Sequence, residues 1–98
     1  MTARRRWLVA YDIRDDRRLR AVHDVVRCYG AMLQYSVYLC DLTPIEKFGL
    51  MVALRDVINH FYDSVVFIDL GEPSRTTSAT IEFMGQSVQL PHRGATIV

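Results

Sequence analysis

The residue types best suited to chemistry in this sequence are three aspartates that follow its first hydrophobic run. Asp12 comes directly after RRWLVAY, and Asp15 and Asp16 follow it closely. Carboxylate oxygens are ligands that Mg²⁺ prefers, and bound Mg²⁺ can neutralise charge on phosphorus and deprotonate a water for phosphodiester hydrolysis. Asp12 is therefore a candidate metal ligand, although one aspartate is a sparse site. From the residues alone, a turn or helix-cap role for Asp12 is the favoured alternative.

Arginines surround this group of aspartates. Eight of the 12 basic residues fall within the first 27 positions, which hold only four acids, although the net charge of the whole chain is +1. Arginine binds phosphate through paired hydrogen bonds, and the exposed amides of a helix start also attract anions. A solvated, arginine-rich helix face explains the same pattern equally well. The candidates for nucleic-acid contact are Arg14, Arg17, Arg18 and Arg20.

The other acidic, cysteine and histidine side chains are predicted to be structural or are left without a predicted role. Asp15 or Asp16 is expected to cap the helix that follows, with outer-sphere contacts to metal-bound water as the alternative. Cys28 and Cys40 lack zinc-ligand spacing and are expected to be reduced thiols that pack as small apolar groups. No role is assigned to the three isolated histidines, His23, His60 and His92.

The strands that position these residues are predicted from apolar and aromatic runs. In the first run, alternation puts Trp7, Val9 and Tyr11 on one face and leaves Asp12 on the other face, at the carboxyl end. The second run is divided in two by a bend or bulge over residues 34–36. The predicted strand runs are 5–12, 31–42, 64–70 and 79–85.

Two helices are predicted between these strands. The first repeats apolar residues at steps of three and four and is expected to end at Gly30 as a C-terminal cap. Thr43, Pro44 and Glu46 carry the cap, the first-turn proline and the acid of a capping box, so the second helix begins there. The buried stripe expected for the second helix is Met51, Leu54, Ile58 and Phe61.

This order of elements predicts an α+β ferredoxin-like βαββαβ sandwich with an additional C-terminal strand. Right-handed connections place both helices on one sheet face, and a second copy is expected to cover the other face as a homodimer. A chain of 98 residues buries one modest core, so residues 1–98 are expected to form a single domain. Its core spans 5–84, and the tail 85–98 is expected to lie on the partner subunit.

Hydropathy excludes membrane and secretory classes. The apolar run after Arg4, Arg5 and Arg6 stops at Asp12, which is too short for a signal peptide core. No segment approaches the roughly 18 apolar residues of a membrane span. A cytoplasmic protein with no membrane partner is the expectation.

Four segments, in order and in register, give this sequence a family resemblance: YDIRDDRRLRAV, CYG, QYSVYLCDL and DSVVFIDLG. The sequence resembles the CRISPR-associated protein two family over residues 7 to about 71. The resemblance implies a ferredoxin-like homodimer that acts in CRISPR adaptation, a branch of antiviral defence. It further implies a magnesium-dependent endonuclease acting on RNA or double-stranded DNA, and a bridge between CRISPR integrase subunits during spacer acquisition.

The resemblance also assigns a site. It makes Asp12 the catalytic metal ligand for Mg²⁺, with its copy in the partner subunit nearby across a twofold axis. Two such carboxylates would repel each other unless a cation or a proton separates them. The family motif SVFE reads SVYL here, with Tyr38 and Leu39 in its last two positions, so no carboxylate is available at position 39.

Two other functions remain open at this point. One is a non-catalytic scaffold that clamps double-stranded DNA by its phosphates, with Asp12 structural. The other is a ferredoxin-like regulatory or single-stranded RNA-binding module, which the absence of an aromatic RNP motif disfavours.

Overall fold

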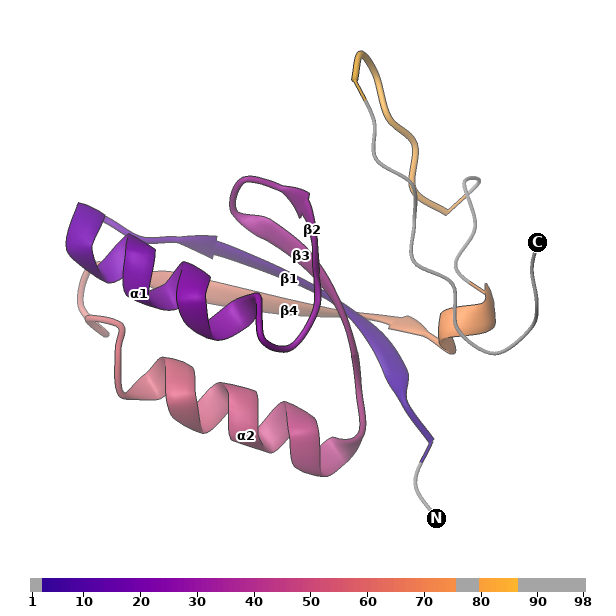
Figure 1. The fold of residues 1–98 in the computed structure, drawn as a ribbon, viewed down its shortest axis with the longest axis horizontal. Helices are drawn as coiled ribbons and strands as arrows, with labels where there is room; N and C mark the ends of the chain where they lie inside the picture. The colour runs from indigo at the N-terminus through magenta and orange to yellow at the C-terminus, as the bar shows by residue number, and fades with distance from the viewer. Residues whose placement is uncertain (1–2, 76–79, 87–98) are drawn as a thin grey trace.

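The computed structural model describes residues 3–75 and 80–86, and it has the predicted βαββαβ order. Its four strands form one antiparallel sheet in the order β2-β3-β1-β4, and both helices lie on the same side of this sheet (Figure 1). This is the ferredoxin-like arrangement. Within these described residues, neither helix has the length and hydropathy to cross a bilayer. The elements are β1 (Arg5–Asp12), α1 (Asp16–Val26), β2 (Ala31–Gln34), β3 (Val37–Leu42), α2 (Pro44–Arg55), β4 (Ser64–Gly71) and a 3₁₀ turn (Pro73–Arg75).

The core lies between the helices and one face of the sheet. On β1, Val9 is fully buried and Tyr11 is 6% exposed, which confirms the predicted alternation. Val22 from α1 and Leu50 and Leu54 from α2 complete this core together with the inward residues of β3. Burying this apolar surface is the main favourable term that holds the helices on the sheet.

The β1 side chains that alternate with Val9 and Tyr11 face away from the helices, as do their register partners on the neighbouring strands. Leu8 and Ala10 on β1 lie opposite Ile68 and Val66 on β4, and these two β4 residues are about half exposed. We call this surface the open face of the sheet. Leu39 of β3 pairs with Leu8 on the open face and is buried.

Both helix starts follow from local sequence chemistry. The Asp15 side chain accepts a hydrogen bond from the Arg18 N–H, so Asp15 and not Asp16 is the N-cap of α1. Thr43 and Glu46 form the predicted capping box at the start of α2. The run 31–42 was expected to form two strands separated by a bend or bulge over residues 34–36. The structure confirms this, with a turn at residues 35–36 between β2 and β3.

Gly30 does not have the predicted role. Helix α1 ends at Val26 with Arg27 as its C-cap, and positive φ angles occur only at Gly71 and Gly85 among the described glycines. A Cβ at residue 30 would collide with the Leu39 carbonyl oxygen. Gly30 is therefore needed for a close approach of two chain segments and not for a left-handed cap.

Two further predictions about the C-terminal half are wrong. The α2 stripe was expected to include Met51 and Phe61, but Met51 is 45% exposed, and Phe61, beyond the helix end, is 92% exposed. The predicted strand 79–85 is not a strand over its described part, residues 80–85, where only turn, bend and irregular backbone occurs. Position 79 and the tail 87–98 lie outside the described residues.

A buried ion pair joins β1 to β3 on the side of the sheet that faces away from the helices. Arg6 and Asp41 are register partners, and the two carboxylate oxygens accept hydrogen bonds of 2.7 and 2.8 Å from Nε and Nη2 of Arg6. The Arg6 side chain is fully buried and that of Asp41 is 6% exposed. Geometry of this kind compensates the cost of removing both charges from water.

We expect Asp41→Ala to lower the free energy of unfolding by about 3 kcal/mol, because it leaves a buried guanidinium without its carboxylate. Urea unfolding at neutral pH measures the change. The matched control is Asp69→Ala, which breaks the Arg5–Asp69 pair with side chains 52% and 38% exposed and should cost about 1 kcal/mol or less. Equal losses in both variants would contradict this interpretation.

Candidate active site

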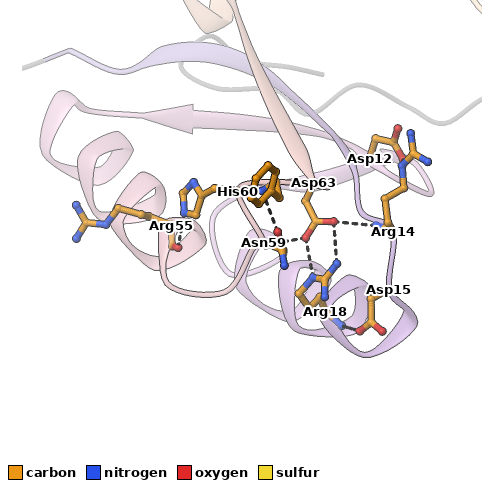
Figure 2. Close-up of polar contacts among 9 residues, drawn as sticks. Asp12, Arg14, Asp15, Arg18, Arg55, Asn59, His60 and Asp63 are labelled. Carbon is orange, nitrogen blue, oxygen red and sulfur yellow. Dashed lines mark hydrogen bonds and ion pairs between the residues drawn. The ribbon is translucent and has the colours of Figure 1, made fainter.

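Asp12 lies at the carboxyl end of β1, at the edge of the open face. Its side chain is 68% exposed, and its nearest ionic partner is Arg14, with 3.6 Å between Oδ1 and Nε (Figure 2). The pair is long and solvated, so it leaves the carboxylate oxygens accessible to a cation. Asp12 does not cap α1, because Asp15 occupies that position.

The oxygen chemistry of Asp12 fits Mg²⁺, but the subunit offers only part of a site. Within residues 3–75 and 80–86, no group of three or more histidine, cysteine or acidic side chains is arranged to hold a metal. Mg²⁺ commonly keeps several waters and takes one or two protein carboxylates together with substrate phosphate oxygens. Asp12 could thus supply one of the carboxylate ligands of such an ion.

Three of the four candidate arginines are exposed around the start of α1: Arg14, Arg17 and Arg20. Arg14 pairs loosely with Asp12, whereas Arg17 and Arg20 form no ion pair with the described part of the chain. The outward face of α1 also carries Asp24 and Arg27, both exposed. Arg17 and Arg20 lie on the helix that follows the Asp12 strand end, and Arg14 lies in the loop between the strand and the helix.

Arg18, the fourth candidate, is bound to Asp63. Its Nε and Nη2 donate hydrogen bonds of 2.7 and 3.1 Å to the two carboxylate oxygens. The Arg18 side chain is only 29% exposed, and that of Asp63 is fully buried. Arg18 therefore joins α1 to the segment before β4 instead of projecting into solvent like the other three.

Asp63 is the centre of a wider set of contacts, shown in Figure 2. In addition to Arg18, it accepts backbone N–H bonds of 2.9 Å from Arg14 and 2.8 Å from Asn59. We call this group of four residues the Asp63 clamp. It connects the β1–α1 loop, helix α1 and the loop before β4. Because Arg14 is two residues from Asp12, the clamp restrains the chain on which the candidate metal ligand lies.

The same contacts change the acidity of Asp63. The hydrogen bond from Arg18 holds the pKa of this carboxyl well below its ordinary 3.8, and the two backbone donors act in the same direction, while burial opposes them. A lowered folded-state pKa means that the unfolded chain binds more protons in acid. The stabilisation is therefore complete above about pH 4 and is lost as the pH falls towards the folded-state pKa.

We accordingly expect the free energy of unfolding of the wild-type chain to fall between about pH 4 and pH 2, and Asp63→Asn to make this fall shallower. Urea unfolding at a series of pH values gives both slopes. Asparagine keeps the side-chain shape but cannot bind a proton in this range. Identical slopes in the two proteins would show that Asp63 is not a major source of acid sensitivity.

His23, which received no role from the sequence, lies between two tyrosines. Its Nδ1 is 3.0 Å from the Tyr11 hydroxyl, and its Nε2 is 3.0 Å from the Tyr38 hydroxyl. Burial raises the pKa of Tyr11 to about 12 and also raises that of Tyr38. These phenols remain protonated near neutral pH. Their hydroxyls can satisfy the hydrogen-bonding capacity of both imidazole nitrogens inside the fold. His23 is therefore a structural residue and not a general base aimed at Asp12.

The remaining sequence candidates are distributed elsewhere. His60 Nε2 contacts the Arg55 carbonyl oxygen at 3.0 Å. Cys40 is buried as expected, and burial raises its thiol pKa to about 12. Cys28 was expected to be packed but is exposed, with its Sγ 3.3 Å from the Asp24 carbonyl oxygen. His92 lies outside the described residues.

Asp63 was not predicted as a site residue, because no motif or capping pattern surrounds it in the sequence. It is separated from Arg18 by 45 positions, so the pair becomes visible only in the fold. The available signal was an aspartate placed directly before a strand that pairs with β1. In the structure, Asp12 and Ser64 are register partners, which brings Asp63 to the same end of the sheet.

Comparisons with known proteins agree with this fold. A family model described as CRISPR associated protein Cas2 matches residues 5–77. A Geobacter sulfurreducens protein named CRISPR-associated endoribonuclease Cas2 is 33% identical over 92 residues, covering 94% of this chain and 96% of that protein. A Rhodospirillum rubrum protein named CRISPR-associated endoribonuclease Cas2 1 is 32% identical over 92 residues, covering 94% and 89% respectively.

Solved structures give the same result. The crystal structure of Streptococcus pyogenes Cas2 at pH 6.5 superposes with a TM-score of 0.72 at 30% identity, covering 82% of this chain and 99% of that one. A Thermus thermophilus hypothetical protein, TT1823, has the same fold with a TM-score of 0.75, 24% identity and coverage of 88% and 96%. The resemblance inferred from four sequence segments is thereby confirmed. This chain belongs to the CRISPR-associated Cas2 family.

Proposed function

We propose that this chain is a homodimeric, Mg²⁺-dependent endonuclease that hydrolyses phosphodiester bonds and works with the CRISPR integrase in spacer acquisition. The observation that carries the proposal is the position of Asp12. Its carboxylate is exposed at the edge of the open face, next to the arginine-rich start of α1. The relatives from Geobacter sulfurreducens and Rhodospirillum rubrum are named endoribonucleases, which supports the reaction class.

A second copy would cover the open face. Val66 and Ile68 are 49% and 48% exposed there, beside Leu8 and Ala10, and they form an apolar surface that a twofold partner can bury. Asp12 has the same parity as Leu8 and Ala10 and lies at the border of this surface. Pairing through the open face would therefore place two Asp12 carboxylates near one twofold axis. A cation shared between them would offset their mutual repulsion.

Each group in the proposed site has a distinct role. Bound Mg²⁺ would supply charge neutralisation at phosphorus and a deprotonated water. The two Asp12 carboxylates would hold the ion, and Arg14, Arg17 and Arg20 would contact neighbouring phosphates and set the position of the strand. The Asp63 clamp keeps Arg14 and the β1–α1 loop in place. Arg18 contributes through that clamp.

A non-catalytic DNA-clamping scaffold is the second candidate. It is favoured by the lack of a multi-residue metal site in the described part of the subunit. Phosphate contacts by Arg17 and Arg20 do not need Asp12, so the basic surface would still bind duplex DNA if no hydrolysis occurs.

Metal removal distinguishes the two functions. We expect the purified chain to cleave single-stranded RNA or duplex DNA with Mg²⁺ and to stop cleaving when EDTA is added. Binding in EDTA should persist and weaken with salt, and Arg17→Ala and Arg20→Ala should each lower the salt slope by about 1, because each variant binds one phosphate fewer. Arg27→Ala, at the far end of α1, is the control. Salt-sensitive binding without cleavage of either substrate would overturn the nuclease and favour the scaffold.

A further inference from the structure

Helix α2 is apolar on two faces. Leu50 and Leu54 point into the core and are at most 3% exposed. Ile45, Phe48 and Met51 lie on another face at steps of three and are 83%, 69% and 45% exposed. A surface helix in a globular protein normally has one apolar stripe, with polar residues opposite. A second stripe of large side chains in solvent marks a contact surface.

Two residues of this second stripe, Phe48 and Met51, line a hollow. A cavity of about 400 Å³ lies between α2 and β4, with Phe48, Met51 and Val52 on the helix side and Val65 and Phe67 on the strand side. A second hollow of about 350 Å³ shares Phe48 and Met51 and continues to Trp7 on β1. The two hollows together are called the α2–β4 trough.

The charged side chains that line the trough all have the same sign. Arg55 stands at one end, and Lys47 and Arg5 at the other, while no carboxylate of the described residues lines either hollow. The Lys47 ammonium lies 4.0 Å from the centroid of the Trp7 ring and forms no ion pair within the described residues. Arg5 and Arg55 are partly balanced by Asp69 and Asp56 outside the lining. The trough therefore combines an apolar floor with a cationic rim.

The topology leaves room for one more helix in this place. β4 is an edge strand, and α2 is the only helix that borders the trough among the described elements. A helix packs against a neighbour at 8–10 Å between axes. An added helix beside α2 would lie over Phe67 and complete the helical layer on this side of the sheet.

Charge decides what kind of helix fits. A second copy of this chain, related by a twofold axis, would set Lys47 and Arg55 against the same cationic rim. The last 12 residues, 87–98, contain no acid and include Pro91, Arg93 and Gly94, which suit neither the rim nor a helix. A partner helix with an apolar face and acidic flanks satisfies both the floor and the rim.

We propose that the α2–β4 trough is a docking site for an amphipathic, acidic-flanked helix of a partner protein. The apolar side of that helix covers Phe48, Met51 and Phe67, and its carboxylates pair with Lys47 and Arg55. This surface is separate from Asp12 and the start of α1, so it adds an interaction to the proposed nuclease without depending on it.

The test uses the full chain and a synthetic probe. The probe is a fluorescein-labelled helical peptide of about 18 residues, with leucines at steps of three and four and glutamates on the flanks. Fluorescence anisotropy should give a Kd on the order of 10 µM, and the same peptide with lysine flanks should bind at least about tenfold more weakly. Phe48→Glu should weaken binding of the glutamate peptide at least about tenfold. Lys47→Glu should reverse the preference between the two peptides.

Phe61→Glu is the matched control, because Phe61 is 92% exposed but does not line the trough. It should bind the peptide like the wild type, and nucleic-acid cleavage should be unchanged in Phe48→Glu. The proposal is overturned if the glutamate peptide does not bind at about 1 mM, if both peptides bind equally, or if Phe61→Glu has the same effect. A lower oligomer mass of Phe48→Glu in sedimentation would assign the trough to a second copy and would also overturn it.

Discussion

Asp12→Asn is expected to lower Mg²⁺-dependent cleavage at least about a thousandfold, because the several kcal/mol that a bound metal contributes to the transition state would be lost. Asparagine has almost the same shape but carries no charge for a hard cation. Since the side chain is 68% exposed and its ion pair with Arg14 is long, the melting temperature should stay within a few degrees of wild type. Initial rates on RNA and duplex DNA, with thermal unfolding of the same samples, measure both effects.

Asp24→Asn is the matched control for this experiment. Asp24 is also 68% exposed and also pairs with one arginine, at 3.4 Å, but it lies near the end of α1. The two variants thus lose the same charge from comparable surroundings, and only the location differs. A rate for Asp12→Asn within about threefold of Asp24→Asn would remove Asp12 from the active site.

Asp63→Ala is expected to cost about 3 kcal/mol of unfolding free energy, which corresponds to a drop in melting temperature of roughly 12–24 °C for a domain of this size. The substitution removes the acceptor for Nε and Nη2 of Arg18 and for the N–H groups of Arg14 and Asn59. Donors left unpaired in a largely buried place each carry a desolvation penalty. Thermal and urea unfolding at neutral pH give the value.

The control for Asp63→Ala is Asp56→Ala, which breaks an ion pair with Arg55 whose side chains are 64% and 72% exposed. It should change stability by no more than about 0.5 kcal/mol. Asp63→Asn should lie between the two, because its amide oxygen can still accept one or two of the hydrogen bonds. If Asp63→Ala were as mild as Asp56→Ala, the clamp would not restrain the β1–α1 loop as described.

These two predictions separate chemistry from positioning. Asp12 should affect rate with little change in stability, because its carboxylate faces solvent. Asp63 should affect stability first, because its carboxylate is enclosed by donors from three segments of the chain. Any effect of Asp63 substitutions on cleavage should therefore be partly recovered by Asp63→Asn, which preserves the contact with the Arg14 N–H.

Features that depend on neighbouring residues were predictable from the amino-acid sequence. Alternation in 5–12 placed Val9 and Tyr11 in the core and Asp12 at the carboxyl end of β1, because strand side chains alternate whatever the surroundings. Thr43 and Glu46 located the start of α2 because a capping box closes within one turn. Family membership also followed from local segments that keep their order and spacing.

The remaining features became visible only in the folded chain, because the contacts involved join distant segments. The Arg18–Asp63 pair spans 45 positions, and the need for glycine at residue 30 arises from the approach of Leu39. The exposure of Met51 depends on the absence of an element beyond the edge strand β4 among the described residues. The alternating pattern in 80–85 does not form a strand there, since a strand also needs a neighbour for its hydrogen bonds, and alternation alone does not supply one.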